Sequence, residues 1–198
     1  HLLTLINDVL DLSKIEAGQV SLELMACDPA AVARDTLDLL RPRASERGTT
    51  LTLEIADDAP EGIEADPTRL RQILVNLVGN AVKFTEAGTV TVTLDTDGDH
   101  ARFRIADTGI GISSEQRERI FMPFSQAEES TTRTYGGTGL GLTISQQLAQ
   151  AMDGGISVES EPGVGSTFTV RVRVGDPSRH PRPDPEPSPA AAAVGRLP

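Results

Sequence analysis

The stretch from Asp66 to Phe84, DPTRLRQILVNLVGNAVKF, decides the fold. Asp66 is a favourable N-cap residue and Pro67 suits the first helical position, so a helix is expected to begin here. The apolar residues recur with the helical period and give the helix one wide buried face, which must pack on a sheet or on other helices. That face consists of Leu70, Ile73, Leu74, Leu77, Val78 and Ala81.

The segments around this helix predict a mixed architecture. Asp28-Pro29 repeats the cap-and-proline signal and opens a second helix that runs to about Arg47. Alternating and β-branched runs predict the strands, and Asp97-Gly98-Asp99 is a favourable hairpin turn. The order is not a regular βαβ alternation, so we predict an α+β fold: a two-layer α/β sandwich, with helices on one face of a mixed, mostly antiparallel sheet. The expected strands are 20–26, 51–55, 89–95, 101–106, 155–160 and 166–174, and the remaining expected helices are 114–120 and 140–152.

Three regions follow from the patterning. Residues 1–18 predict a helix with two adjacent apolar seams, as in a helical bundle, and residues 19–175 form the sandwich. Residues 176–198 are rich in proline and lack hydrophobic periodicity, which predicts a disordered linker. Because the chain begins with His1 rather than Met, we expect it to be a fragment of a longer protein.

The composition excludes several functions. Among the 198 residues, 18 are Lys or Arg and 29 are Asp or Glu, for a net charge of −11, which argues against nucleic acid or an anionic membrane as a partner. Cys27 is the single cysteine, so no internal disulfide can form. No apolar run is long enough to span a membrane, and a cytoplasmic location is expected. A phosphate ligand remains possible if a metal ion and backbone N–H groups hold it.

Common phosphate-binding motifs are absent. The only lysines, Lys14 and Lys83, do not stand in a Gly-Lys-Ser/Thr sequence, which excludes a P-loop. The His-Arg-Asp and Asp-Phe-Gly sequences of eukaryotic protein kinases are also missing. Gly137, Gly139 and Gly141 do not have the spacing of a dinucleotide-binding fingerprint.

Three other clusters could bind a ligand. Asn76 and Asn80 are four residues apart on the 66–84 helix with Lys83 on the same stripe, which indicates either a polar ligand or a solvated face. Asp107-Thr108-Gly109-Ile110-Gly111 follows a strand and suits hydrogen bonding to a base or sugar, although a capped turn is the simpler interpretation.

The third cluster, Gly136–Leu142, leads into a helix, so its backbone N–H groups could face an anion; the alternative is a flexible hinge. Between the second and third clusters lies Phe121-Met122-Pro123-Phe124, interpreted as the apolar anchor of a mobile lid or as a satellite core.

In this order, the clusters resemble the ATP-binding domain of the sensor histidine kinases. Asn76–Lys83 matches that family's N box, Asp107–Gly111 its first glycine box, Phe121–Phe124 its F box and Gly137–Gly141 its second glycine box. The helix at 1–18 is similar to the end of the family's second dimerisation helix. The stretch from Phe124 to Arg133 is similar to the hybrid kinases, which carry a receiver domain. The resemblance implies a Bergerat-type fold preceded by part of a helical dimerisation hairpin.

The resemblance also implies roles for individual residues. Asp107 would accept a hydrogen bond from the adenine amino group, and Gly111 would line the base pocket. Asn80 would hold Mg²⁺, Asn76 would assist it, and Lys83 would contact a phosphate. The other residues expected to contact ATP are Gly109, Phe124, Gly137, Thr138, Gly139, Leu140 and Gly141.

Asn76 bears on the reaction. In the related heat-shock, gyrase and mismatch-repair ATPases, the corresponding residue looks to be a water-activating glutamate, whereas an amide cannot be a general base. The expected reaction is therefore transfer of the γ-phosphate to a histidine of the dimerisation domain. That acceptor is expected before residue 1, because His1, His100 and His180 lack its sequence context. A nucleotide-hydrolysing ATPase and a non-catalytic dimerisation or binding module remain the alternatives. The implied partners are a homodimer partner and a receiver domain.

Overall fold

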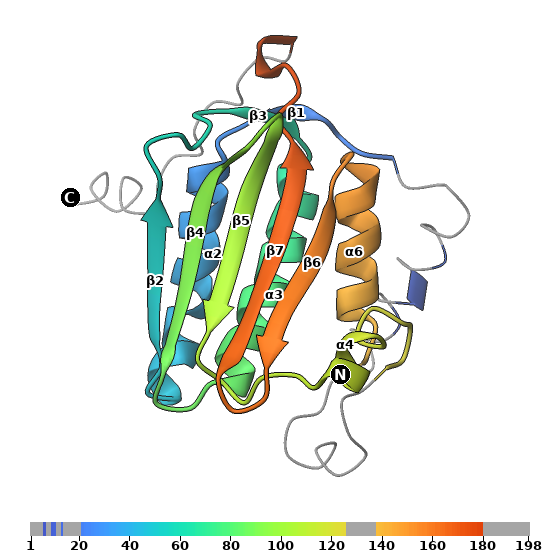
Figure 1. Ribbon diagram of the computed structural model, residues 1–198. Helices are drawn as coiled ribbons and strands as arrows, with labels where there is room; N and C mark the ends of the chain where they lie inside the picture. Colours follow the sequence, from blue (N-terminus) through green and yellow to red (C-terminus); the bar gives the residue numbers. More distant parts are fainter. Residues whose placement is uncertain (1–5, 7–8, 11–12, 14–20, 126–137, 180–198) are drawn as a thin grey trace, which may run out of the picture.

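The computed structural model describes Ile6, Val9, Leu10 and Ser13, and residues 21–125 and 138–179. It is a two-layer sandwich in which one face of a five-stranded sheet is covered by helices (Figure 1). The helices are α2 (Pro29–Glu46), α3 (Pro67–Phe84), α4 (Ser114–Arg117), α6 (Gly141–Ala151) and the 3₁₀ helix η1 (Pro177–Arg179). The strands are β1 (Met25–Cys27), β2 (Thr50–Ile55), β3 (Ile63–Ala65), β4 (Thr89–Asp97), β5 (His100–Asp107), β6 (Gly155–Glu161) and β7 (Gly165–Arg173).

The main sheet has the strand order β2-β4-β5-β7-β6. Strands β2 and β4 are parallel, and all the other neighbours are antiparallel. The β4–β5 hairpin closes at the pair Asp97 and His100, with Gly98 at φ +66° in the turn. The predicted α/β sandwich with a mixed, mostly antiparallel sheet is therefore confirmed.

Aspartate caps start both long helices, as the sequence predicts. The Asp28 side chain accepts a hydrogen bond of 2.9 Å from the Ala31 N–H. The Asp66 carboxylate accepts bonds of 3.0 Å and 3.1 Å from the N–H groups of Thr68 and Arg69. These bonds satisfy N–H groups that have no partner within the helix, so the two caps fix where α2 and α3 begin.

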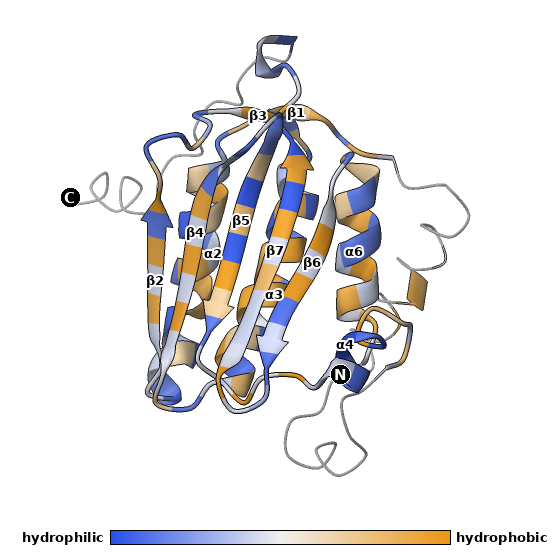
Figure 2. Cartoon of the chain, viewed as in Figure 1, coloured by the Kyte–Doolittle hydropathy of each residue, from blue (hydrophilic) through white to orange (hydrophobic). Residues whose placement is uncertain are grey.

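The core lies between the sheet and the helices. Leu70, Ile73 and Leu77 of α3 are completely buried, as are Phe103 and Ile105 of β5. Hydrophobic and polar residues alternate along the strands (Figure 2), which is the pattern of a sheet with one packed face and one solvated face. Hydrophobic burial at this interface is the main force that holds the two layers together.

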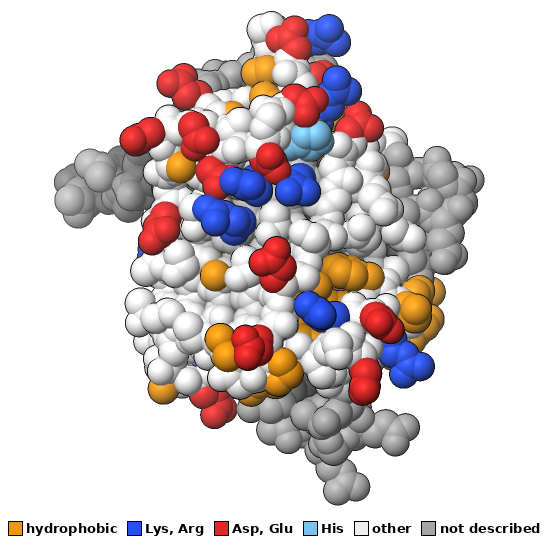
Figure 3. All heavy atoms as spheres, viewed as in Figure 1, with side chains coloured by type: hydrophobic (Ala, Val, Ile, Leu, Met, Phe, Trp, Pro, Cys, Tyr) orange, Lys and Arg blue, Asp and Glu red, His pale blue; other side chains and the backbone are white. Residues whose placement is uncertain are grey.

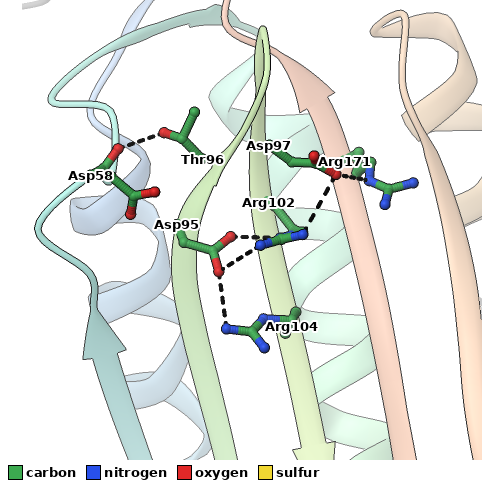
Figure 4. A network of polar contacts seen from close by, with 7 residues as sticks. All are labelled: Asp58, Asp95, Thr96, Asp97, Arg102, Arg104 and Arg171. Carbon is green, nitrogen blue, oxygen red and sulfur yellow. Dashed lines mark hydrogen bonds and ion pairs between the residues drawn. The ribbon is translucent and has the colours of Figure 1, made fainter.

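The other face of the sheet carries a charged network (Figures 3 and 4). Asp95, whose side chain is 8% exposed, accepts from Arg102 at 2.7 Å and 3.1 Å and from Arg104 at 3.0 Å. The hydrogen bond from Arg102 is the first cause that lowers the pKa of Asp95. Asp97 joins the network through an ion pair of 2.7 Å with Arg171.

A second, smaller sheet lies at one end of the sandwich. Strand β1 pairs antiparallel with β3, and the N–H of Glu64 in β3 donates to the Val174 carbonyl at 2.7 Å. The Asp176 N–H donates to the Glu64 carboxylate at 3.0 Å, and Pro177 contacts Gly62. Residues 174–179, here named the exit turn, are thus attached to β3.

Several boundaries differ from those expected. Strand β1, Met25–Cys27, overlaps the expected 20–26 strand only at residues 25 and 26 and ends one residue later. Strand β3 was not predicted. Residues 176–179, assigned to the linker from their composition, contact β3 and include η1. The remainder of the expected linker, 180–198, lies outside the described residues.

For the expected N-terminal helix, the structure describes four residues, Ile6, Val9, Leu10 and Ser13, and all four are helical. Across the described part of the chain, no helix combines the length and the apolar character needed to span a membrane.

Candidate functional site

The described residues of the three sequence clusters lie at the same end of the sandwich. Strand β5 ends there at Asp107, α3 ends there at Phe84, and α6 begins there at Gly141 (Figure 1, lower end). The β1–β3 sheet lies at the opposite end. The fold therefore brings together residues that are far apart in the sequence, such as Asn76 of α3 and Ser145 of α6, which are 69 positions apart.

The two asparagines of α3 contact each other and α6. Asn80 Nδ2 lies 3.5 Å from Asn76 Oδ1, and Asn76 Nδ2 donates to the Ser145 hydroxyl at 2.9 Å. Gly141 packs directly on the Asn76 amide, since an added Cβ would lie 2.5 Å from Asn76 Oδ1. The asparagine stripe is therefore not a simple solvated face.

Lys83 lies one turn beyond Asn80, and its Nζ is 4.9 Å from the centroid of the Phe84 ring. Burial lowers the pKa of Lys83, and the nearby Arg43 guanidinium lowers it further. A partly desolvated ammonium beside another cation gains from an anionic partner, which suits contact with a phosphate.

Asp107 is half-buried at the end of β5. Its Oδ1 accepts the Gly109 N–H at 2.8 Å. Burial raises the pKa of Asp107, while the backbone N–H groups of Gly109 and Ser166 oppose that rise by stabilising the carboxylate. The result is a fixed carboxylate acceptor in a partly desolvated position.

The glycines after Asp107 permit very close packing. Gly111 has φ +69°, and a Cβ there would overlap the carbonyl of Glu161. A Cβ on Gly109 would lie 2.8 Å from Asp107 Oδ1 and 2.9 Å from Thr85 Oγ1. Thr85 Oγ1 is buried, with no hydrogen-bond partner in the part of the chain that the structure describes. Thr85 is completely buried, so this hydroxyl lies in the packing beneath Gly109.

Three serines near the site were missed by the sequence reasoning. The Ser160 hydroxyl accepts the Ile112 N–H at 2.8 Å, donates to the Gly165 carbonyl at 2.8 Å and lies 2.9 Å from the Ser166 hydroxyl. Ser145 holds Asn76 from α6. Isolated serines form no recognisable pattern in the sequence. Only the Gly163-Val164-Gly165 turn before Ser166 could have indicated this part of the site.

The phenylalanine segment divides into two environments. Phe121 packs against the core, and its carbonyl accepts the Thr143 hydroxyl at 3.0 Å. Phe124 is 65% exposed with φ +60°, and its N–H donates to the Gly139 carbonyl at 3.1 Å. Phe121 therefore packs against the core, as the satellite-core interpretation predicts, whereas Phe124 lies beside Gly139 and its role as the anchor of a lid stays a prediction.

The second glycine box is described from Thr138 onward, whereas Gly136 and Gly137 lie outside the described residues, as do Ser130–Arg133 of the hybrid-kinase stretch. Thr138 Oγ1 accepts the Leu140 N–H at 3.2 Å, and Gly139 has φ +71°. Leu140 is completely buried, so only its backbone is available to a ligand.

The donor set constrains how a metal could bind. Within residues 21–125 and 138–179 there is no group of three or more His, Cys, Asp or Glu side chains suited to a metal ion. A divalent cation here would rely on asparagine oxygens and on the ligand's own phosphates. Mg²⁺ is commonly bound in that way, with few protein ligands and several shared with the nucleotide.

The fold is a two-layer α/β sandwich in which the half-buried Asp107 lies at the end of β5 and the Asn76 amide of α3 contacts the start of α6. A family model, described as histidine kinase-, DNA gyrase B-, and HSP90-like ATPase, matches residues 65–176, and the chain belongs to this family. Within it, the chain is a histidine kinase-type catalytic domain.

Curated relatives agree with this placement. The chain is 46% identical over 172 residues to the circadian input-output histidine kinase CikA of Synechococcus elongatus, covering 86% of the chain and 23% of CikA. It is 44% identical over 179 residues to the sensor protein GacS of Pseudomonas syringae pv. syringae, covering 88% of the chain and 20% of GacS. The chain thus spans about a fifth of the length of these relatives.

Solved structures agree as well. The crystal structure of full-length ShkA in complex with AMPPNP matches with a TM-score of 0.78 and 40% identity, over 89% of this chain and 37% of ShkA. The catalytic domain of histidine kinase ThkA matches with a TM-score of 0.67 and 26% identity, over 80% of this chain and 99% of that domain.

Proposed function

We propose that this domain transfers the γ-phosphate of Mg²⁺-ATP to a histidine on a dimerisation domain in two-component signalling. The observation that carries the proposal is the environment of Asn76. Its amide faces Ser145, Gly141 and Asn80, and none of these side chains can take a proton from water. Phosphoryl transfer needs mainly positioning and charge neutralisation, which this site can supply.

Each group has a distinct task in this proposal. The Asp107 carboxylate accepts from the adenine amino group, with Gly109 and Gly111 allowing the backbone to approach the base. Asn80, assisted by Asn76, holds Mg²⁺, which neutralises phosphate charge when it is bound. Lys83 contacts a phosphate oxygen, and the backbone of residues 137–141 wraps the triphosphate.

The partners are also part of the proposal. The two apolar seams in the sequence of residues 1–18 suit a helix of a dimerisation bundle shared with a second copy of the protein. A receiver domain is the expected acceptor from the phosphohistidine, since the stretch after Phe124 is similar to that of hybrid kinases. The expected location is the cytoplasm, where ATP is available.

The test is phosphorylation with γ-labelled ATP. The present chain alone should remain unlabelled, whereas the longer protein with its own upstream segment should acquire an acid-labile phosphate. Asp107→Asn in the longer protein should strongly reduce the label at an ATP concentration near the wild-type Kd. A longer protein that binds ATP but stays unlabelled would contradict the proposal and favour a non-catalytic module.

Hydrolysis is tested separately by phosphate release from the present chain over many turnovers. The proposal predicts release close to the background rate, because Asn76 cannot activate water. Sustained release that disappears in Asp107→Asn would instead support the ATPase alternative.

A further inference from the structure

Helix α6 fixes both ends of the Asn76 amide. Ser145 is 2% exposed, and its hydroxyl lies 2.9 Å from Asn76 Nδ2. Gly141, one turn earlier, is so close that an added Cβ would lie 2.5 Å from Asn76 Oδ1 and 3.1 Å from Cγ. A hydroxyl within a helix often bonds to a carbonyl of its own preceding turn, but here it contacts a different helix.

The orientation of Asn76 constrains Asn80. An amide has one donor end and one acceptor end, so fixing its nitrogen also fixes the direction of its oxygen. Asn76 Oδ1 lies 3.5 Å from Asn80 Nδ2. With its nitrogen turned toward Asn76, Asn80 keeps its own Oδ1 as the acceptor available to a cation.

We propose that Ser145 is a positioning residue for the nucleotide-bound metal and acts through Asn76 on Asn80. The inference rests on the proposed function, because it concerns the two asparagines that would hold Mg²⁺. It adds a residue from outside the sequence clusters. It also links the metal site to the helix that directly follows the second glycine box, so the position of that box and the orientation of the asparagines are coupled.

Two further contacts make α6 suitable for this role. The hydroxyl of Thr143, two residues before Ser145, donates to the Phe121 carbonyl at 3.0 Å. Leu140, at the N-cap position of α6, is completely buried. The first turns of α6 are therefore held against both α3 and the phenylalanine segment, which gives Ser145 a fixed place from which to orient Asn76.

The test compares AMPPNP affinity in Mg²⁺ with AMPPNP affinity in EDTA for four chains: wild type, Ser145→Ala, Ser145→Thr and Ile144→Val. Residues that orient a metal ligand typically change metal affinity by about 10–100-fold when replaced. The gain from Mg²⁺ is the ratio of the AMPPNP affinity in Mg²⁺ to that in EDTA. We expect Ser145→Ala to reduce this gain roughly tenfold, with unchanged AMPPNP affinity in EDTA. Ser145→Thr keeps the hydroxyl and should retain most of the gain.

Ile144→Val is the matched control, because Ile144 is a buried neighbour on α6 that loses only packing. Its gain from Mg²⁺ should equal that of the wild type. An unchanged gain in Ser145→Ala, or an equal loss in Ile144→Val, would overturn the positioning role. A wild-type chain that binds AMPPNP equally with and without Mg²⁺ would contradict the metal site itself and thus the proposed function.

A second readout needs no nucleotide. In ¹H–¹⁵N spectra of the free domain, the side-chain amide signals of Asn76 and Asn80 should both shift in Ser145→Ala and return toward their wild-type positions in Ser145→Thr. Movement of the Asn76 signal alone would overturn the coupling to Asn80. Ala is the best helix former, so α6 should remain folded in Ser145→Ala.

Discussion

At the scale of single residues, Asp107 combines a proposed role in binding adenine with a pKa that burial raises. Burial raises the pKa of Asp107 above its ordinary value of 3.8, against the stabilising N–H groups of Gly109 and Ser166. A raised carboxyl pKa means that the folded state favours the proton. Any stability from this group is therefore present below its ordinary pKa and is lost as the pH rises through the raised pKa.

We expect carboxyl ¹³C NMR of the free domain to give Asp107 a pKa above 3.8. AMPPNP should lower this pKa, because an adenine amino donor stabilises the carboxylate. Asp107→Asn should weaken AMPPNP binding by about 10–100-fold, from roughly 1–3 kcal/mol of lost or mismatched hydrogen bonding, while the domain stays folded. If the pKa of Asp107 did not change when AMPPNP binds, the proposed hydrogen bond to adenine would be contradicted.

Gly111 gives a second prediction at this scale. An alanine there meets both a left-handed φ of +69° and the Glu161 carbonyl, so Gly111→Ala should lower the free energy of unfolding by more than the roughly 1–3 kcal/mol of backbone strain alone. Gly163 is the matched control, with φ +78° and no atom within 4 Å of an added Cβ. Urea unfolding of both variants measures the difference, and equal losses would show that the overlap with Glu161 is unimportant.

At the scale of elements, the long segments could be predicted from sequence and the short ones could not. Asp-Pro caps and a sustained periodicity of apolar residues predict helices α2 and α3. Strand β3 has only three residues, too few to show an alternation of apolar and polar residues. Its hydrogen bonds to β1 and Val174 hold it in position. The same reasoning applies to the site: Asn76, Asn80 and Asp107 stand in recognisable spacings, whereas the serines are brought to them only by tertiary packing.

Cys27 reports on the small β1–β3 sheet. Burial, followed by the nearby Asp28 carboxylate, raises the pKa of Cys27 from 9.0 to about 11, which leaves roughly a hundredfold less thiolate at pH 8 than an unperturbed thiol. We expect a thiol reagent to label the folded domain at least that much more slowly than the urea-unfolded chain. Labelling at similar rates would mean that β1 opens freely.

Gly175, in the exit turn, allows a test of whether that turn affects the labelling of Cys27. It has φ +61°, and an added Cβ would lie 2.7 Å from the Glu64 side chain, so Gly175→Ala should loosen the exit turn from β3. Because β3 also pairs with β1, Cys27 should then label faster than in the wild type. Gly163→Ala introduces comparable backbone strain at the far end of the sheet and should leave the Cys27 rate unchanged. Equal rates in wild type and Gly175→Ala would show that the exit turn does not support β1.

At the scale of the whole molecule, the net charge of −11 and the proposed polyanionic ligand are compatible because charges are arranged locally. Lys83 and Arg43 lie near each other at the end of the sandwich where α3 ends, the proposed nucleotide site. Asp95 and Asp97 are paired with arginines on the outer face of the sheet. In the proposed function, neutralisation of the triphosphate would therefore depend largely on Mg²⁺ and on backbone N–H groups.

The exit turn also determines how the domain bears mechanical load. Strand β1 and the exit turn are both hydrogen-bonded to β3, at the end of the sandwich opposite Asp107. Tension applied between residues 21 and 179 would first load the hydrogen bonds that join β1 and the exit turn to this three-residue strand. In a single-molecule pulling experiment, a short, low-force extension should therefore precede the main rupture, and AMPPNP should strengthen only the second event.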